Sequence, residues 1–405
     1  MCRVVPKSLP LILALVGADI KTFYCRITDI VLCLGEPLAP RQYAVILRLP
    51  VLQFNTGKNS TDMRIATQHS GFVLIALAVW QLSAATPNEG PKPGPEGAAA
   101  VPPKKIVRPG SKEPGVKRPL STITPVYVFQ MTGIPDWVAV SPDSLWFSHQ
   151  PDNMLNRVDP KTNKVVASIP VGKTPCAGMV YGFDSMWLPH CGEKFVYRVD
   201  VKTNKVVAKV PVGPAASEGG IAVTDDSVWI LSDRRGVLSR IDPDTNKVIA
   251  EIATPAGCYD TAAGFGSLWV TCTDANLLLR VNPATNLIEQ RIPVGKGPRF
   301  LAAGEGAVWT LNEIDGSVTR VDPKTNKAEA TIEAGVPHPG DIATGEGAVW
   351  VSSFDYPLTR IDPETNKVTQ QWEGRGGDAV RAAFGSIWMS GYREGFIWRI
   401  DPKLL

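Results

Sequence analysis

Seven copies of one short phrase run through the C-terminal part of this 405-residue chain. The phrase is Arg-(Val/Ile)-Asp-Pro-x-Thr-Asn, with small departures in some copies, and its arginines lie 39 to 42 residues apart. These arginines are Arg157, Arg198, Arg240, Arg280, Arg320, Arg360 and Arg399. A tryptophan recurs in the same phase, at Trp146, Trp187, Trp229, Trp269, Trp309, Trp350 and Trp388. Two markers that keep one period over seven copies predict a protein built from seven equal structural units.

Each unit has the pattern of four strands joined by short turns. In the third unit we expect these strands at residues 220–224, 228–231, 237–241 and 247–252. Asp-Pro-x-Thr-Asn suits the third turn, because proline presets φ and asparagine tolerates a left-handed conformation. Strands like residues 227–231 lack in-and-out alternation, so both of their faces must be covered. The sequence therefore predicts an all-β, seven-bladed β-propeller of four-stranded antiparallel blades, with tryptophan packed between blades, rather than an open solenoid.

The two ends of the repeat region complement each other. The last copy, from Arg399, supplies a third strand but no fourth strand. Residues 126–131 align with 165–170, the fourth strand of the first complete unit, and each segment is followed by a glycine at the same spacing. We therefore expect the N-terminal strand to complete the last blade in a three-plus-one arrangement, which removes an open sheet edge. The predicted propeller covers residues 125–405.

The residues before the propeller have a different composition. Residues 72–80 form a short apolar run between Met63-Arg64 and the small residues 83–85, which is the layout of a secretory signal. We interpret 63–85 as a signal peptide, 1–62 as a miscalled upstream extension, and the Pro-rich residues 86–124 as a disordered linker. In the alternative interpretation, residues 9–16 are the signal or an anchor. Either way we expect an exported protein, periplasmic or extracellular, with no membrane span in the mature chain.

Four cysteines of the propeller region lie in pairs. Cys176 precedes the first strand of its unit and Cys191 follows the second strand, so the two fall opposite each other across the hairpin. Cys258 and Cys272 repeat this arrangement two units later. In an exported protein we expect two disulfides, Cys176–Cys191 and Cys258–Cys272. The alternative is a mixed metal cluster of cysteines with His190.

The variable parts of the repeats fall on one face. In such a blade the third turn lies on the face opposite to the loops that join blades, and these turns are nearly identical from unit to unit. The variable loops gather around the mouth of the central channel, where a repeat protein is free to carry function. The candidate binding residues in them are Trp137, Glu218, Tyr259, Asp260, Arg299, Phe300, Asp378 and Arg393.

Three histidines, His149, His190 and His338, map to the same variable face. With Asp341 they are the candidate catalytic residues, because histidines near carboxylates can hold a divalent metal such as Mg²⁺ or transfer protons. In the alternative interpretation each histidine ends a strand and bonds a loop carbonyl. No nucleophile elbow, P-loop, dinucleotide fingerprint or HExxH motif accompanies them, so the cofactor stays open.

The charge of the chain gives little sign of a nucleic-acid partner. The formal net charge is +3, and the lysines of the repeated turns are balanced by neighbouring aspartates, without clustered aromatic side chains. We expect a monomer whose partner is a small molecule or a protein. Nucleic-acid binding by the lysine-bearing face remains a weaker alternative, which a steep loss of affinity with salt would indicate.

Residues 159–172, Asp-Pro-Lys-Thr-Asn-Lys-Val-Val-Ala-Ser-Ile-Pro-Val-Gly, resemble the YVTN-type propeller repeat. The blade order, with Pro-x-x-Gly before the first strand and Ser-(Val/Leu)-Trp in the second, is similar to that of the streptogramin (virginiamycin B) lyase family. The resemblance covers 125–405 and implies a seven-bladed propeller. It also implies Mg²⁺-assisted elimination that opens a cyclic depsipeptide, using Pro-His elements in two successive loops.

One of these two elements is present, as Pro337-His338, whereas the following blade has Gly376-Gly377-Asp378 in the equivalent place. The leading hypothesis is therefore an exported propeller that binds a ligand or protein through its variable loops. The second hypothesis is a metal-assisted lyase or hydrolase of the streptogramin lyase type.

Overall fold

The computed structural model describes residues 30–32, 45–47, 109–336 and 340–405. The short strands β1 (Ile30–Leu32) and β2 (Val45–Leu47) pair with each other in a unit formed by residues 1–98, and the propeller lies in the unit 99–405. The expected signal peptide, the Pro-rich residues up to 108 and His338 lie outside the described residues. Within the described ranges, no helix is long and apolar enough to cross a membrane.

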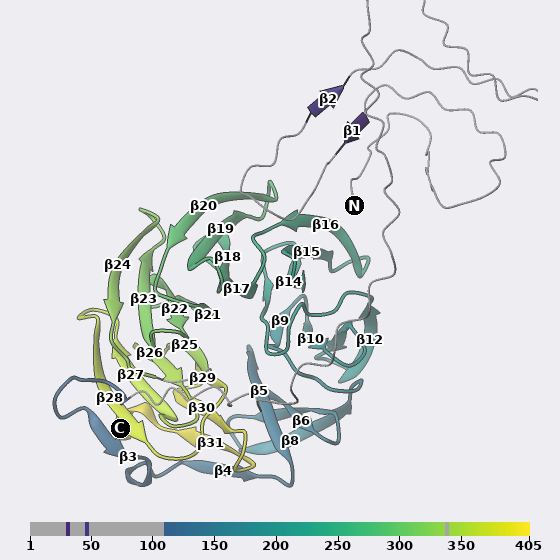
Figure 1. The fold of residues 1–405 in the computed structure, drawn as a ribbon. Helices are drawn as coiled ribbons and strands as arrows, with labels where there is room; N and C mark the ends of the chain where they lie inside the picture. Colours follow the sequence, from purple (N-terminus) through teal and green to yellow (C-terminus); the bar gives the residue numbers. More distant parts are fainter. Residues whose placement is uncertain (1–29, 33–44, 48–108, 337–339) are drawn as a thin grey trace, which may run out of the picture. The chain divides into compact units, whose positions relative to one another are not determined.

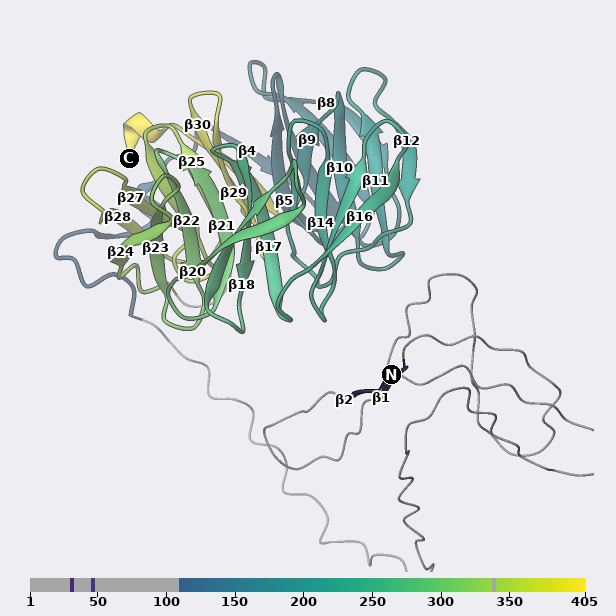
Figure 2. The same ribbon diagram turned by 90° about the horizontal axis from the view of Figure 1, so that it is seen from above.

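Seven antiparallel sheets lie around a central axis, and each has its first strand innermost (Figures 1 and 2). We number them as blades 1 to 7. Blade 1 is β5 (Ile134–Ser141), β6 (Ser144–Gln150), β7 (Met154–Asp159) and β8 (Lys164–Pro170), and blade 2 is β9 (Val180–Gly182), β10 (Ser185–His190), β11 (Phe195–Asp200) and β12 (Lys205–Val210). Blade 3 is β13 (Ile221–Val223), β14 (Val228–Asp233), β15 (Val237–Asp242) and β16 (Lys247–Ala253), and blade 4 is β17 (Cys258–Gly264), β18 (Ser267–Cys272), β19 (Leu277–Asn282) and β20 (Leu287–Pro293). Blade 5 is β21 (Pro298–Gly304), β22 (Ala307–Asn312), β23 (Ser317–Asp322) and β24 (Lys327–Ile332), and blade 6 is β25 (Asp341–Gly345), β26 (Ala348–Ser352), β27 (Leu358–Asp362) and β28 (Lys367–Glu373) with β3 (Lys117–Pro119). Blade 7 is β29 (Val380–Ala383), β30 (Ser386–Gly391), β31 (Phe396–Ile400) and β4 (Tyr127–Gln130), and two short 3₁₀ helices, η1 (Leu120–Thr122) and η2 (Pro402–Leu404), complete the described elements.

The predicted three-plus-one closure is confirmed. β4 pairs antiparallel with β31, with Tyr127 opposite Arg399 and Gln130 opposite Phe396. Phe129 turns inward from this strand and is 8% exposed, and its ring lies 6.4 Å from that of Trp388. The N-terminal strand therefore supplies both the outer edge and part of the core of blade 7.

Residues 109–124 differ from the expected disordered linker. β3 adds a fifth strand to blade 6, parallel to β28, with Lys117 opposite Gln371. All three residues of β3 are exposed, so its attachment depends on backbone pairing and on the buried side chains that flank it, Val116, Leu120 and Ile123. Three isolated apolar residues among proline, glycine and lysine are too few to form a recognisable strand pattern, so the sequence predicts a linker here.

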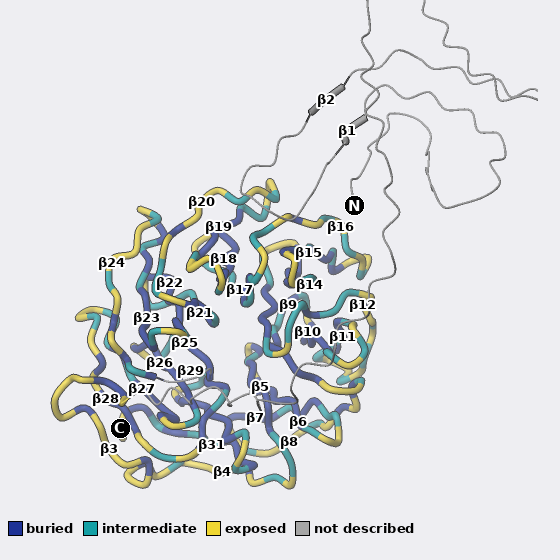
Figure 3. Tube along the Cα trace, viewed as in Figure 1, coloured by how far each residue is buried: buried dark blue, intermediate teal, exposed yellow. Residues whose placement is uncertain are grey.

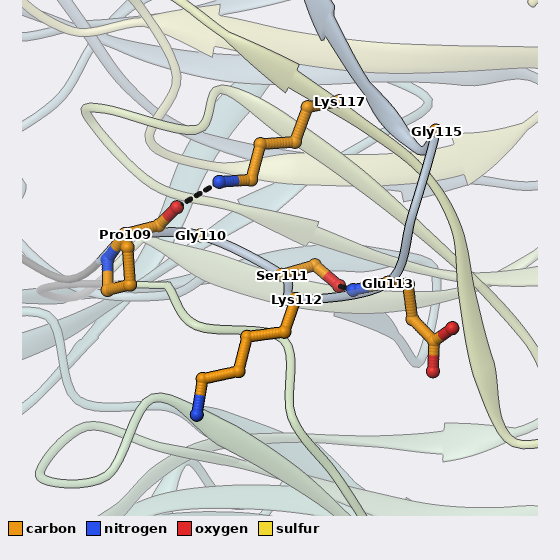
Figure 4. A pocket seen from close by; sticks show the side chains of 7 residues that line it. All are labelled: Pro109, Gly110, Ser111, Lys112, Glu113, Gly115 and Lys117. Atoms are coloured by element: carbon orange, nitrogen blue, oxygen red, sulfur yellow. Dashed lines mark hydrogen bonds between the residues drawn. The ribbon is translucent and has the colours of Figure 1, made fainter.

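The segment ahead of β3, residues 109–115, is called the strap here, and hydrogen bonds from the backbone amides of Gly110 and Ser111 hold it in place. The Gly110 amide donates to the carbonyl of Gly335 at 3.1 Å, and the Ser111 amide donates to Oε1 of Gln371 at 2.7 Å. A Cβ on Gly335 would lie 2.0 Å from the Gly110 oxygen, so only glycine allows this approach. Figure 4 shows the strap folding back on itself around a pocket of about 430 Å³, with Lys117 donating to the Pro109 carbonyl.

The recurring arginine and asparagine join neighbouring blades. Each blade tryptophan is fully buried, and the arginine opposite it on the third strand lies over its ring, 4.8 to 5.5 Å from the centroid. The Arg240 guanidinium, for example, donates to Ser227 in its own blade and to Oδ1 of Asn286, 2.9 Å away in the next. Asn286 has φ of 60°, and the equivalent asparagines of the other complete turns lie between 54° and 58°. The left-handed asparagine predicted from the sequence therefore has a second role, as the acceptor for the preceding blade.

The core lies in the inner three strands of each blade. Figure 3 shows the second strands buried, whereas the outermost strands such as β20 and β24 carry exposed residues. The turns between third and fourth strands form one face, and the loops between second and third strands and between blades form the other, which we call the mouth face. Backbone hydrogen bonds and the arginines of neighbouring blades hold the repeated turns, so their sequence is constrained. Sequence differences between blades are therefore concentrated in the loops of the mouth face.

Candidate binding site at the channel mouth

The innermost strands bring side chains of blades 1, 4 and 5 together at the axis. Trp137 comes from β5 of blade 1 and Phe300 from β21 of blade 5, yet their rings lie 5.8 Å apart. Tyr259 of blade 4 meets the same phenylalanine edge-on at 5.7 Å. Trp137 and Phe300 are 6% and 2% exposed, so they fill the channel and give the mouth a solid apolar floor.

Two carboxyl groups at the mouth belong to the fold. Asp260 accepts the Leu301 amide of the next blade at 3.1 Å and the Thr261 amide at 2.7 Å. Asp341 does the same with the amides of Val380 at 3.1 Å and Ile342 at 2.8 Å, and it also accepts from Arg381. Burial raises the pKa of Asp260 to about 7 and also raises that of Asp341, against the lowering effect of these donors. Both groups join adjacent innermost strands, so their structural role explains their burial.

Asp136 and Asp378 have no comparable set of donors. Asp136 is 6% exposed, and its carboxyl group accepts one hydrogen bond, from Gln150 at 3.2 Å. The carboxyl group of Asp378 accepts no hydrogen bond from the described residues, although its amide donates to Ser352. Burial, with the neighbouring Glu218, raises the pKa of Asp136 to about 7. Burial, followed by the charges of Asp136, Glu218 and Asp341, holds the pKa of Asp378 well above its usual range.

Three arginines of the mouth face, Arg299, Arg381 and Arg393, are engaged with other groups. Arg299 donates to Glu218 of blade 3, to Tyr259 at 2.7 Å and to Glu313 at 3.1 Å, so it bridges three blades. Tyr259 in turn donates to the Ser217 carbonyl at 2.5 Å. Arg381 is bound to Asp341, and Arg393 lies over the Phe354 ring, 4.1 Å from its centroid. Asp136 and Asp378 therefore form no ion pair with the described residues, and only the charge of Arg299 acts to lower the pKa of Asp378.

His149 and His190 contact separate loops, and none of their described contacts is with each other. His149 lies with Nε2 3.1 Å from the Thr132 carbonyl oxygen and Nδ1 3.8 Å from Asp152. His190 is fully buried, with Nδ1 3.3 Å from the Lys173 oxygen and its ring 4.2 Å from that of Tyr197, and burial lowers its pKa. Each ring thus lies against a loop carbonyl, as in the alternative interpretation, and His338 lies outside the described residues.

Carboxylate oxygens are the ligands that Mg²⁺ prefers. Within the described ranges, however, no group of three or more histidine, cysteine, aspartate or glutamate side chains could hold a metal ion. Asp341, the carboxylate predicted to act with the histidines, is instead committed to backbone amides and Arg381. The described residues therefore do not fit the divalent ion that the family resemblance implies, and no chemistry here is assigned to one.

Both predicted disulfides are present. Cys176–Cys191 and Cys258–Cys272 have Cα–Cα distances of 5.8 and 3.6 Å. The first joins the loop before β9 to the residue after β10 in blade 2, and the second joins the first residue of β17 to the last residue of β18 in blade 4; both lie on the mouth face. They are not part of a metal cluster with His190, which was the competing interpretation.

Removing the blade 4 disulfide should lower stability without changing the fold. The bond closes a loop between residues 14 apart, and the chain-entropy model assigns a loop of this size about 3 kcal/mol. We expect Cys258→Ser/Cys272→Ser to lose about this amount in chemical denaturation, with an unchanged circular dichroism spectrum. Mass mapping of non-reduced peptides from the unaltered protein is the control, and free thiols there would contradict the pairing.

Asp136 and Gln150 are not among the site residues predicted from the sequence. An alignment of the repeats could have found the first. Asp136 and Asp378 each lie three residues before the residue that pairs with the blade tryptophan, in the adjacent blades 1 and 7. Tyr259 and Arg299 hold the same position in blades 4 and 5, so this one position supplies four of the ionisable groups.

The raised pKa of Asp136 predicts a stability that falls as the pH rises. The unfolded carboxyl group titrates near about 3.9, so the native state binds the extra proton between that pH and about 7. The favourable contribution is complete below the unfolded pKa and is lost as the pH rises through the folded value. We expect Asp136→Asn to stabilise the protein at pH 8 by about 2–4 kcal/mol, less at pH 5, and not below pH 4.

Urea denaturation at these three pH values measures this effect. Asp225→Asn, at an exposed turn of blade 3, is the matched control and should change little at any pH. A gain for Asp136→Asn that is the same at all three values would contradict the assigned protonation.

Three solved structures share this fold at low sequence identity. A selenomethionine-substituted virginiamycin B lyase from Staphylococcus aureus aligns with a TM-score of 0.60 at 17% identity, over 68% of this chain and 98% of its own. A catalytically inactive form of that enzyme with quinupristin gives 0.58 at 16% identity, with the same two coverages. A streptogramin B lyase structure gives 0.57 at 17% identity, over 67% of this chain and 96% of its own. No protein-family model and no curated protein matches the chain. At these identities the likeness concerns the fold alone, and the chain has the seven-bladed propeller architecture seen in those lyase structures.

Proposed function

We propose that this propeller is a binding module that captures a small organic cation at its channel mouth. The observation that carries the proposal is the pair Asp136 and Asp378, a buried and a half-buried aspartate in adjacent blades, whose carboxyl groups accept no backbone amide of the described residues. Burying such groups without a cation costs stability, and groups of this kind concentrate at functional sites. A ligand ammonium group would supply the missing positive charge.

The comparison with Asp260 and Asp341 supports this assignment. These two aspartates are as deeply buried as Asp136, yet backbone amides of the next blade explain them. Asp136 directly precedes Trp137, whose ring packs against Phe300 in the apolar floor, and this suits a ligand whose cation adjoins a hydrocarbon or aromatic part. The remaining acid, Glu218, is held by Arg299 at the rim of the same site.

Calorimetric titration tests the proposal with a panel of small amines, diamines, polyamines and quaternary ammonium compounds. We expect at least one member to bind the full chain, and Asp136→Asn/Asp378→Asn to lose about tenfold or more in affinity, since each lost charged contact is worth about 1.5–3 kcal/mol. Asp225→Asn is the control. Binding that the double variant leaves unchanged would contradict a site at these carboxyl groups.

A second candidate function is acid–base catalysis at the same carboxyl groups. It is favoured by the pKa of Asp136, raised to about 7, because a general acid or base works best near the ambient pH. The fold neighbours include a lyase structure with quinupristin, so quinupristin is the first substrate to test. Opening of its ring, followed by mass spectrometry with and without Mg²⁺, would favour catalysis if Asp136→Asn abolished it.

We also propose that the protein is exported and works outside the cytoplasm as a monomer. The two disulfides support an oxidising compartment. N-terminal sequencing of the mature protein from cell fractions tests this, with processing expected after residue 85. A cytoplasmic protein that keeps residues 63–85 would contradict it. Gel filtration with light scattering tests the monomer.

A further inference from the structure

A separate pocket lies on the mouth face where loops of blades 3, 4 and 5 meet. It has a volume of about 310 Å³, and its lining includes Ala216, Ala256, Gly257 and Cys258. The ionisable residues that line it are Arg234, Tyr259, Asp274, Arg299 and Glu313. The pocket therefore combines small apolar groups with side chains of both charges.

Two opposite charges in this pocket are unpaired. Arg234, in the β14–β15 loop, and Asp274, in the β18–β19 loop, are exposed, and their side chains form no hydrogen bond or ion pair with the described residues. The next residue, Arg235, behaves differently because it pairs with Asp233 of its own loop. Arg234 and Asp274 line one pocket without meeting each other, so both are available to a ligand.

Gly257 fixes the two loops in this arrangement. Its amide donates to the Arg234 carbonyl at 3.1 Å, and its carbonyl accepts from the Thr273 amide at 3.0 Å. Its φ is 75°, and an added Cβ would lie 2.1 Å from Oδ2 of Asp274. The adjacent Cys258–Cys272 disulfide ties the segment of Gly257 to the end of β18, directly before the loop of Asp274. The pocket is thus preorganised by backbone hydrogen bonds and a covalent bond.

We propose that this pocket binds a small zwitterion, an α-amino acid or a dipeptide, with its carboxylate at Arg234 and its ammonium group at Asp274. A guanidinium group matches a carboxylate with two parallel hydrogen bonds. A simple anion would face Asp274 and Glu313, and a simple cation would face Arg234 and Arg299, so a ligand with both charges fits better than either. The volume is at the small end of small-molecule sites, which limits the ligand to this size.

This inference does not depend on the proposed cation site, because the charged side chains that bind the ligand here are Arg234 and Asp274 and not Asp136 and Asp378. Arg299 borders both sites, since it lines the pocket and also holds Glu218. The test therefore leaves Arg299 unchanged.

The experiment titrates the full chain with the twenty common L-amino acids and a set of dipeptides, by calorimetry or ligand-observed NMR. We expect at least one to bind, and Arg234→Gln and Asp274→Asn each to weaken it by about tenfold or more. Arg235→Gln is the matched control and should bind normally. The N-acetyl derivative lacks the ammonium group, so it should bind the unaltered protein as weakly as the parent ligand binds Asp274→Asn. The amide lacks the carboxylate, so it should bind the unaltered protein as weakly as the parent ligand binds Arg234→Gln.

Three outcomes would overturn the proposal. In the first, no zwitterion of the panel binds the folded protein. In the second, Arg235→Gln loses as much affinity as Arg234→Gln, and in the third the blocked derivatives bind as well as the parent compound. Amine binding that is lost in Asp136→Asn/Asp378→Asn but kept in Arg234→Gln would separate the two sites.

Discussion

Replacing residues 127–130 with Gly-Ser-Gly-Ser in the full chain should lower the free energy of unfolding by about 4–6 kcal/mol. Truncation of a buried phenylalanine such as Phe129 alone costs about 3–5 kcal/mol, and the pairing of β4 with β31 is lost as well. The effect should exceed the sum of local contacts, because the ring then opens at blade 7 and exposes an unpaired strand edge. Guanidinium denaturation followed by tryptophan fluorescence measures the shift.

The matched control replaces residues 112–115 with Ser-Gly-Ser-Gly, which keeps the glycine at residue 115, where φ is 73°. These four residues are exposed, and they belong to the turn before β3. We expect a change within about 0.5 kcal/mol for the control. Equal losses in the two variants would mean that β4 does not close the ring.

The second large effect is expected for Arg399→Ala, which should cost about 3 kcal/mol. Arg399 of blade 7 donates to the Pro160 carbonyl and to Oδ1 of Asn163, 2.8 Å away, both in blade 1. It also donates to Ser386 at 2.9 Å and lies over the Trp388 ring at 5.1 Å. Hydrogen bonds to a charged group contribute about 1.5–3 kcal/mol each, although their effects do not add fully.

Arg360 provides the control within the same repeat. It lies over the Trp350 ring at 5.5 Å, but its guanidinium donates to Gln370 of its own blade at 3.4 Å. Blade 7 ends without the turn that would receive it, because its outer strand is β4 from the N-terminal side. We expect Arg360→Ala to cost about 1 kcal/mol in the same denaturation assay. A loss as large as that of Arg399→Ala would show that the ring contact between blades adds nothing.

The fold was predictable because its signal is periodic. Seven tryptophans and seven arginines in phase indicate the number of blades, and the missing fourth strand after Arg399 indicates the closure. β3 was missed because Lys117, Arg118 and Pro119 carry no apolar pattern, and the fifth strand of blade 6 depends on backbone pairing. A sequence pattern reports side chains, so such an addition leaves no trace in it.

The sequence predicts which face of the propeller carries the site, but it does not predict the role of each residue there. Sequence position places Asp260, Asp341 and Asp378 on the mouth face, and all three are there. It does not distinguish Asp260, bonded to the Leu301 amide, from Asp378, whose carboxyl group has no donor among the described residues. That difference depends on where the amide of the next blade points, and this geometry is a property of the assembled ring. For the same reason, the sequence does not show that His149 and His190 lie against loop carbonyls and not beside the carboxyl groups of the mouth face.

The arginine–asparagine contact between blades has a consequence for how this molecule can change over time. Each such contact joins one blade only to the following one, and the contact between blades 7 and 1, Arg399 to Asn163, uses the same pair of residue types as that from blade 3 to blade 4. The repeated arginine–asparagine contacts therefore lie on one face of the propeller, while the variable loops lie on the mouth face. Loops of the mouth face that do not contact a neighbouring blade can be exchanged with little effect on assembly, whereas Asp260, Asp341 and Arg299 must be kept because they bond residues of other blades. Substitutions that change what the propeller binds can therefore accumulate in most of the variable loops without changing the repeated contacts that hold the blades together.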